Sequence, residues 1–106
     1  MNGLKGLVMV AIGLLGTTVN FASAADIEKG KQKALICGSC HGKDGVGIAE
    51  NIPNLAGQKE TYLALQLIAF RDGFRKNMQM TPMAKGLTDE DIQNIAAFYA
   101  SLPAKK

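Results

Sequence analysis

The chain has 106 residues, with 12 Lys and Arg against 9 Asp and Glu, which gives a formal charge of +3. Without Lys5, which lies in the N-terminal segment described next, that charge falls to +2. This is too small for the basic stripe that nucleic-acid binding needs, so we expect no nucleic-acid partner. The length allows one small domain, and a domain of this size usually needs a disulfide, a metal or a cofactor for stability.

Residues 1–24 have the pattern of a secretory signal peptide. Lys5 precedes an apolar stretch over residues 6–19, and Ala22-Ser23-Ala24 forms a small-x-small cleavage site. The apolar stretch is too short to span about 30 Å of hydrocarbon. We expect cleavage after Ala24, which takes 24 of the 106 residues and leaves residues 25–106 as one domain of 82 residues. The alternative is an uncleaved segment that anchors the chain to a membrane; after cleavage we expect no stable membrane insertion.

A first helix is predicted from about Asp26 to Ile36, with Asp26 as its N-cap. The residues expected near one face are Ile27, Gly30, Ala34 and Leu35. A glycine inside a helix costs about 1 kcal/mol relative to alanine. Gly30 therefore predicts close approach by another helix.

A second helix is predicted from about Lys59 to Asp72, with Gly73 as its C-terminal stop. Its broad apolar face would be formed by Tyr62, Leu63, Leu65, Leu67, Ala69 and Phe70. Between the first two helices runs a glycine-rich loop, HGKDGVGIAENIPNLAG, which has turn residues and little to bury.

The third helix has the clearest boundary signals. Thr88 and Asp91 have the spacing of a capping box, and Pro103 stops the helix. The residues at helical spacing on one face are Ile92, Ile95, Ala96, Tyr99 and Leu102. The segment before this helix, NMQMTPMAKG, is expected to be irregular. The whole pattern predicts an all-α domain of three main helices and two long loops, whose thin core needs a large apolar group that is not in the sequence.

The stretch CGSCH holds both cysteines of the chain and its only histidine, at Cys37, Cys40 and His41. A closed zinc site would need a fourth ligand of Cys or His type. A redox dithiol belongs at the start of a helix that follows a strand, whereas this motif is expected at the end of the first helix. A disulfide across two residues would close a very small loop. The pattern C-x-x-C-H is also typical of covalent c-type haem attachment, which uses all three side chains and supplies the missing apolar mass.

The chain resembles a class I cytochrome c of the bacterial periplasmic, single-haem kind. It equally resembles one half of the two-haem cytochromes c of that group. The resemblance rests on CGSCHGKDG, IPNLAGQ and MTPMAKGLTDEDIQNIAAFYASL, and on their order and spacing. It covers about Asp26 to Leu102. It implies the cytochrome c fold, wrapped around one covalently attached haem c.

The resemblance also implies roles for particular residues. Cys37 and Cys40 would form the thioethers, and His41 would be the proximal axial ligand. Pro53 would offer its backbone carbonyl to the other imidazole nitrogen, which fixes the tautomer and strengthens donation to iron. Gly30 would lie where the first helix crosses the last, close to Tyr99.

The sixth ligand is implied to be a methionine from the loop before the last helix. In the group that this chain resembles, the pattern M-x-x-M has its first methionine as the ligand, which indicates Met80. Met83 would then pack against the edge of the ring. Spacing alone does not separate Met80 from Met83, and Met78 is also near.

The function implied is electron transfer in the periplasm, not enzymatic catalysis, with one haem cycling between Fe(II) and Fe(III). The partners would be redox proteins of respiratory or dehydrogenase systems, and a monomer is expected. The alternatives are a tightly bound cytochrome subunit of a periplasmic oxidoreductase, and a protein whose labile methionine lets it bind a small ligand. Basic residues in or beside the segments around the haem are expected to steer an acidic partner: Lys43, Lys59, Arg71, Arg75, Lys76 and Lys85.

Overall fold

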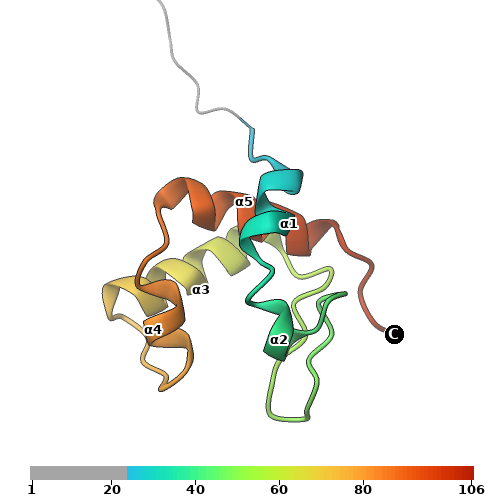
Figure 1. Ribbon diagram of the computed structural model, residues 1–106, viewed down its shortest axis with the longest axis horizontal. Helices are drawn as coiled ribbons and strands as arrows, with labels where there is room; N and C mark the ends of the chain where they lie inside the picture. The colour runs from blue at the N-terminus through green and yellow to red at the C-terminus, as the bar shows by residue number, and fades with distance from the viewer. Residues whose placement is uncertain (1–23) are drawn as a thin grey trace, which may run out of the picture.

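The computed structural model describes residues 24–106, and within this range the protein is all-α, as the sequence predicts (Figure 1). The predicted signal peptide lies outside the described residues except for Ala24. No helix in the described part is long and apolar enough to cross a membrane. The elements in chain order are α1 (Ile27–Lys33), α2 (Gly38–His41), α3 (Glu60–Asp72), α4 (Met80–Ala84) and α5 (Asp89–Ser101).

Helix α1 begins as predicted but ends early. The Asp26 carboxylate accepts a hydrogen bond from the backbone N–H of Lys29 at 3.0 Å, which caps the N-terminus. The helix stops at Lys33, where the N–H of Leu35 turns to the carbonyl of Gln32, a tighter i to i−3 bond. The expectation that the helix runs to Ile36 is therefore wrong, and Leu35, expected near one face with Gly30 and Ala34, lies beyond its end and is 77% exposed.

Helix α1 crosses α5 at Gly30, so the close approach that the glycine predicts is confirmed. The nearest atoms to a Cβ built on Gly30 belong to Asn94 and Ile95, about one turn before Tyr99, the residue that the resemblance implies as its neighbour. The contact is reinforced by the backbone N–H of Asp26, which donates to the side-chain oxygen of the buried Asn94 at 2.8 Å.

The boundaries of α3 and α5 agree with the sequence, because their signals are local. Gly73 ends α3 in the left-handed conformation, with φ +88°. At the start of α5 the capping box is complete: Thr88 Oγ1 accepts from the N–H of Asp91, and the Asp91 carboxylate accepts from the N–H of Thr88, both at 3.0 Å.

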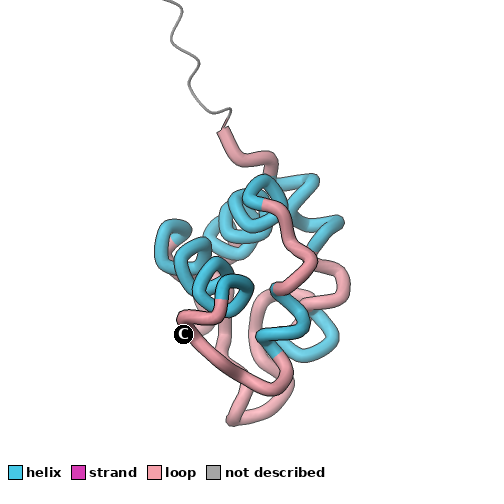
Figure 2. Tube along the Cα trace, turned by 90° about the vertical axis from the view of Figure 1, so that its left-hand side faces the viewer, coloured by secondary structure: helices cyan, strands magenta, loops and turns pink. Residues whose placement is uncertain are grey.

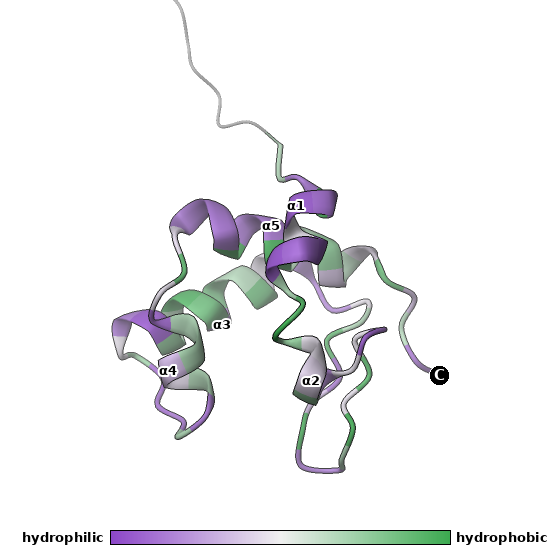
Figure 3. Ribbon diagram, viewed as in Figure 1, coloured by the Kyte–Doolittle hydropathy of each residue, from purple (hydrophilic) through white to green (hydrophobic). Residues whose placement is uncertain are grey.

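A small core lies where α5 meets α1 and α3 (Figures 1 and 2). The hydropathy of α3 is high along the ribbon, whereas α1 and the first turns of α5 are largely polar (Figure 3). The predicted apolar face of α3 is too broad, since Tyr62 and Leu65 are about half exposed. The buried core residues are Ala34, Leu63, Ala64, Ile92, Ile95, Ala96, Phe98 and Tyr99.

Two short helices, α2 and α4, are not among the elements that the sequence predicts. Helix α2 contains most of the CGSCH stretch. Helix α4 lies within the segment predicted to be irregular and includes Pro82. Proline is tolerated there because its missing N–H falls in the first turn, where that group has no partner inside the helix. Helix α4 packs against α3.

Candidate functional site

His41, at the end of α2, is one of two buried polar residues in the part of the chain described, with 7% of its surface exposed. Its Nδ1 lies 2.9 Å from the backbone carbonyl oxygen of Pro53. A carbonyl can only accept, so this contact places the ring proton on Nδ1. The other ring nitrogen, Nε2, is then unprotonated and able to bind a metal.

The glycine-rich loop folds back on itself to bring Pro53 to His41. Gly42 and Gly45 have φ of +83° and +77°, a region that glycine occupies without strain. The carbonyl of Gly45 accepts from the N–H of Leu55 at 2.7 Å and of Ala56 at 3.0 Å. The contact predicted between His41 and Pro53 is thus present because backbone hydrogen bonds close the loop around it.

The thiols of Cys37 and Cys40 are both free, Cys37 half-buried and Cys40 exposed. Cys37 is the N-cap of α2, so the expectation that the motif ends a helix is wrong: it begins a short one. Even so, no strand precedes it within residues 24–106. Burial raises the pKa of the Cys37 thiol, the opposite of what a reactive dithiol needs.

The zinc interpretation finds no support in the described range, where no three His, Cys, Asp or Glu side chains gather to hold a metal ion.

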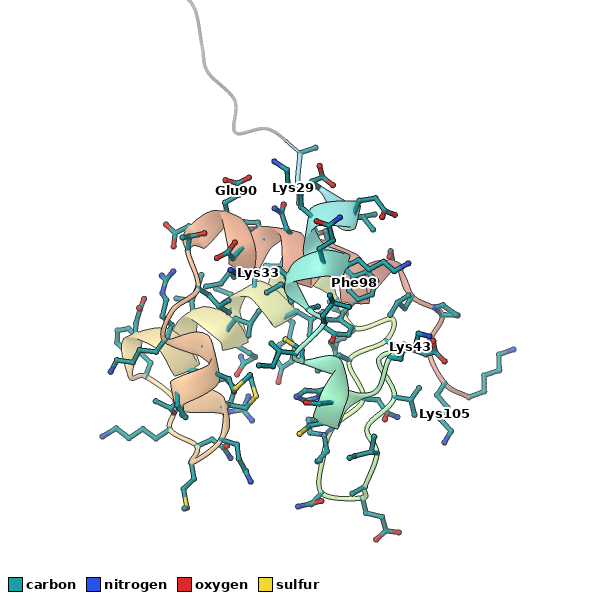
Figure 4. The ribbon with its side chains drawn as sticks, viewed as in Figure 1. Lys29, Lys33, Lys43, Glu90, Phe98 and Lys105 are labelled. Carbon is teal, nitrogen blue, oxygen red and sulfur yellow. The ribbon has the colours of Figure 1, made fainter. Side chains whose placement is uncertain are left out.

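A cavity of about 340 Å³ opens beside Cys37 and Met80. Sulfur atoms lie on the sides of α2 and α4 that face one another (Figure 4). Met83 also lines the cavity but is 41% exposed, while Met78 is 93% exposed and is not part of the lining. The remaining lining residues are Lys33, Ile36, Leu67, Pro82, Ala84, Gly86 and Leu87.

The donor set and walls of this cavity fit a haem c. The thiol of Cys37 and the thioether of Met80 line the cavity, and most of its walls are apolar. Cys40 and His41 are not among the lining residues, but they lie on α2, the helix that Cys37 begins, and the imidazole of His41 keeps Nε2 free because Nδ1 is paired with Pro53. A larger hollow of about 520 Å³ lies against residues 46–50, residues 52–54 and Lys105, but no sulfur or imidazole group lines it. The smaller cavity is therefore the one whose residues fit a haem c.

Two of the six basic residues expected to steer a partner are held by other groups. Arg71 donates to Asp89 at 2.7 Å, to Asp72 at 2.9 Å and to the carbonyl of Leu87 at 3.2 Å. The hydrogen bonds between Arg71 and Asp72 lower the pKa of the carboxyl group, and those to Asp72 and Asp89 raise the pKa of the guanidinium. Arg75 lies over the ring of Phe70, 4.5 Å from its centre.

Of the ten lining residues, sequence reasoning assigned only Cys37, Met80 and Met83 to the haem; the seven that it missed include Lys33, Ile36 and Leu87. Ile36 and Leu87 are apolar residues directly before Cys37 and Thr88, and that position beside two recognised motifs is the signal that could have indicated them. Lys33 carries no such signal. It is the basic side chain at the cavity, at the last position of α1.

Comparisons with known proteins agree with this site. The cytochrome c family model matches residues 27–103. Cytochrome c-554(548) of Halomonas halodenitrificans is 52% identical over 81 residues, covering 74% of this chain and 98% of that protein. Cytochrome c4 of Pseudomonas aeruginosa is 42% identical over 101 residues, covering 95% of this chain and 49% of its own length, so the chain spans about half of that protein. The crystal structure of reduced cytochrome c4 from Pseudomonas stutzeri superposes with a TM-score of 0.71 at 42% identity, covering 74% of this chain and 46% of the other.

Proposed function

This chain belongs to the cytochrome c family, and from that premise we propose that it is a periplasmic electron carrier in which His41 and Met80 are the axial ligands of the haem iron. Members of the family are electron carriers, not enzymes, and this chain is one of them. It holds one haem c through Cys37 and Cys40. The ligand pair, the compartment and the partners are what we propose.

The observation that carries the ligand pair is the cavity that Cys37 and Met80 share, together with the buried His41 at the end of α2, the helix that Cys37 begins. Of the three neighbouring methionines, Met80 is the most buried one, which favours it over Met83 and Met78. The resemblance to cytochromes with an M-x-x-M pattern supports the same choice.

Bound haem supplies an iron that exchanges one electron between Fe(II) and Fe(III). The residues around the haem determine the relative stability of Fe(II) and Fe(III). The Met80 thioether favours the reduced state, and apolar walls act in the same direction because the more highly charged oxidised centre is harder to desolvate. The hydrogen bond from His41 to Pro53 fixes the ring and strengthens its donation. His41 and Met80 would both hold the iron, so a substrate would have no ready access to it.

The pattern of residues 1–24 supports export to the periplasm, where redox proteins of respiratory or dehydrogenase systems would be the donor and acceptor. Docking would use a small surface around the cavity, since weak redox encounters commonly bury less than about 1,200 Å². Lys33 is the charge best placed to guide such a partner.

The proposal is tested by spectra of the protein purified from the periplasm, with Met80→Ala and Met83→Ala beside the wild type. We expect haem that survives acid-acetone extraction, a sharp α-band on reduction, and a weak near-infrared sulfur-to-iron band in the oxidised form. Met80→Ala should abolish the near-infrared band and Met83→Ala should keep it. Loss of the band only in Met83→Ala would transfer the ligand role to that residue, and loss in neither variant would reject both.

A second candidate function is a tightly bound subunit of a periplasmic oxidoreductase. It is favoured by Phe74 and Met78, which are 86% and 93% exposed and lie outside the lining of the cavity. Haem staining of periplasmic protein separated on a native gel distinguishes the two. A band at the size of the isolated chain supports the carrier, and a band only at much larger size supports the subunit.

A further inference from the structure

The segment that carries Met80 is fixed to α3 where it begins. The backbone N–H of Arg75 donates to the carbonyl of Ala69 at 3.0 Å, and its guanidinium donates to the side chain of Gln66 at 2.7 Å while lying over Phe70. These contacts hold the chain up to Arg75. The residues that then lead into α4 are 76–79, and their conformation decides where Met80 is presented.

Asn77 organises this short connection through four hydrogen bonds. Its side-chain oxygen accepts from the backbone N–H of both Gln79 and Met80, each at 2.9 Å. Its own N–H donates to Thr81 Oγ1 at 2.9 Å, and its carbonyl accepts from the N–H of Thr81 at 3.1 Å. Asn77 is thereby linked to each of the three residues from Gln79 to Thr81.

These bonds take the place of a missing cap. The N-cap of α4, Gln79, makes no capping hydrogen bond with its own side chain, so the first N–H groups of the helix depend on another acceptor. Asn77 supplies it, and one of the two donors is the backbone of Met80 itself. Met83 is held differently, by an N–H bond to the Gln79 carbonyl at 3.3 Å.

We propose that Asn77 is the positioning residue for Met80, and that it keeps the thioether on the iron by holding the first turn of α4 in place. The inference rests on the proposed function, in which Met80 is the sixth ligand. Without the side chain of Asn77, two N–H groups lose their acceptor and the turn opens more often. Each opening would move the Met80 sulfur away from the iron and give a small ligand access to it.

The test compares Asn77→Ala with Asn77→Asp, which keeps an oxygen that accepts from both N–H groups. Asn51→Ala, a change at an exposed asparagine in the other loop, is the matched control. Two readouts are taken on the haem-loaded protein: amide hydrogen exchange at Gln79 and Met80, and the rate at which carbon monoxide binds the reduced form. For Asn77→Ala we expect both rates to rise about fivefold, the usual effect of losing a helix cap. Asn77→Asp and Asn51→Ala should stay near the wild type.

Unchanged exchange and unchanged carbon monoxide binding in Asn77→Ala would overturn the inference, as would an equal rise in Asn77→Asp. Met80→Ala separates this failure from failure of the ligand assignment. If Met80→Ala keeps the near-infrared band, the assignment is wrong and the inference falls with it. If Met80→Ala loses the band while Asn77→Ala behaves like the wild type, only the inference is wrong. Should Asn77→Ala not accumulate with haem, Asn77→Leu, which keeps the size of the side chain and removes the oxygen that accepts from Gln79 and Met80, is measured in the same way with the same two outcomes.

Discussion

Gly30 and Asn94 are packed so closely that a Cβ placed on Gly30 would lie 1.9 Å from the carbonyl oxygen of Asn94. Backbone atoms on both sides leave no flexible side chain to yield, so α1 and α5 must separate if Gly30 gains a methyl group. We expect Gly30→Ala to lower the free energy of unfolding by about 2 kcal/mol, because overpacking exceeds the gain in helix propensity. Thermal unfolding of the oxidised protein, followed at the haem and by far-UV circular dichroism, measures this loss.

Gln32→Ala is the control for that change. Gln32 is an exposed residue of the same helix and does not line the cavity. Its melting temperature should stay within a degree or two of the wild type. Equal melting temperatures for Gly30→Ala and Gln32→Ala would mean that the helix crossing tolerates a wider separation than the structure has.

The capping box of α5 predicts a dependence of stability on pH. The backbone hydrogen bond from Thr88 is the main cause of the lowered pKa of Asp91. A carboxylate with a lowered pKa stabilises the fold above its unfolded value and loses that contribution as the pH falls below it. At pH 7 we expect Asp91→Ala to cost about 1 kcal/mol of unfolding free energy. The difference from wild type should shrink as the pH falls below 3.8, the unshifted pKa of the carboxyl group.

Urea unfolding of both proteins between pH 7 and pH 3 measures that difference. Glu90→Ala serves as the control, since Glu90 is an exposed residue of the same turn whose ion pair with Lys29 is 3.7 Å long. Exposed pairs of this kind contribute little. A difference between Asp91→Ala and wild type that stays constant with pH would assign the loss to the side chain's shape and not to its charge.

Without haem the chain should not fold cooperatively. In the described residues, the core cluster of α1, α3 and α5 holds two aromatic side chains, Phe98 and Tyr99, and several of its members are alanines. A group bound only by the folded state stabilises that state, so its removal from so small a core leaves the unfolded chain favoured. We expect a Cys37→Ala, Cys40→Ala double variant that lacks haem to show little helical circular dichroism. A sharp thermal transition in that variant would show that the polypeptide core is sufficient.

Lys33 should guide anionic partners to the cavity. It lies at the end of α1 and lines the cavity, and half of its side chain is exposed while its amino group is 3.6 Å from Asp91 (Figure 4). At low ionic strength we expect Lys33→Gln to slow oxidation of the reduced protein by ferricyanide about twofold or more. The difference should disappear near 1 M salt, where charges are screened within about 3 Å. Lys105→Gln, which is not part of the lining, should leave the rate unchanged; equal effects of the two changes would point to net charge alone.

The three main helices could be predicted from the sequence, because their boundaries depend on groups a few residues apart. Asp26 caps α1, Gly73 ends α3, and Thr88 with Asp91 begins α5, all without reference to the rest of the chain. The C-x-x-C-H motif is equally local, since five consecutive residues are enough to indicate the haem. Propensity and capping need only nearby backbone, which is why these predictions hold.

Which distant residues meet depends on the tertiary packing. It places Gly30 against Asn94, leaves Leu35 exposed, and forms α4 in a segment expected to be irregular. It also brings Cys37 and Met80 to one cavity, and separates Met78 from it. Such contacts follow from how α1 and α3 pack on α5 and from how the loops close between them. No periodicity within a single element contains that information, because it depends on the packing of segments that are far apart in the chain.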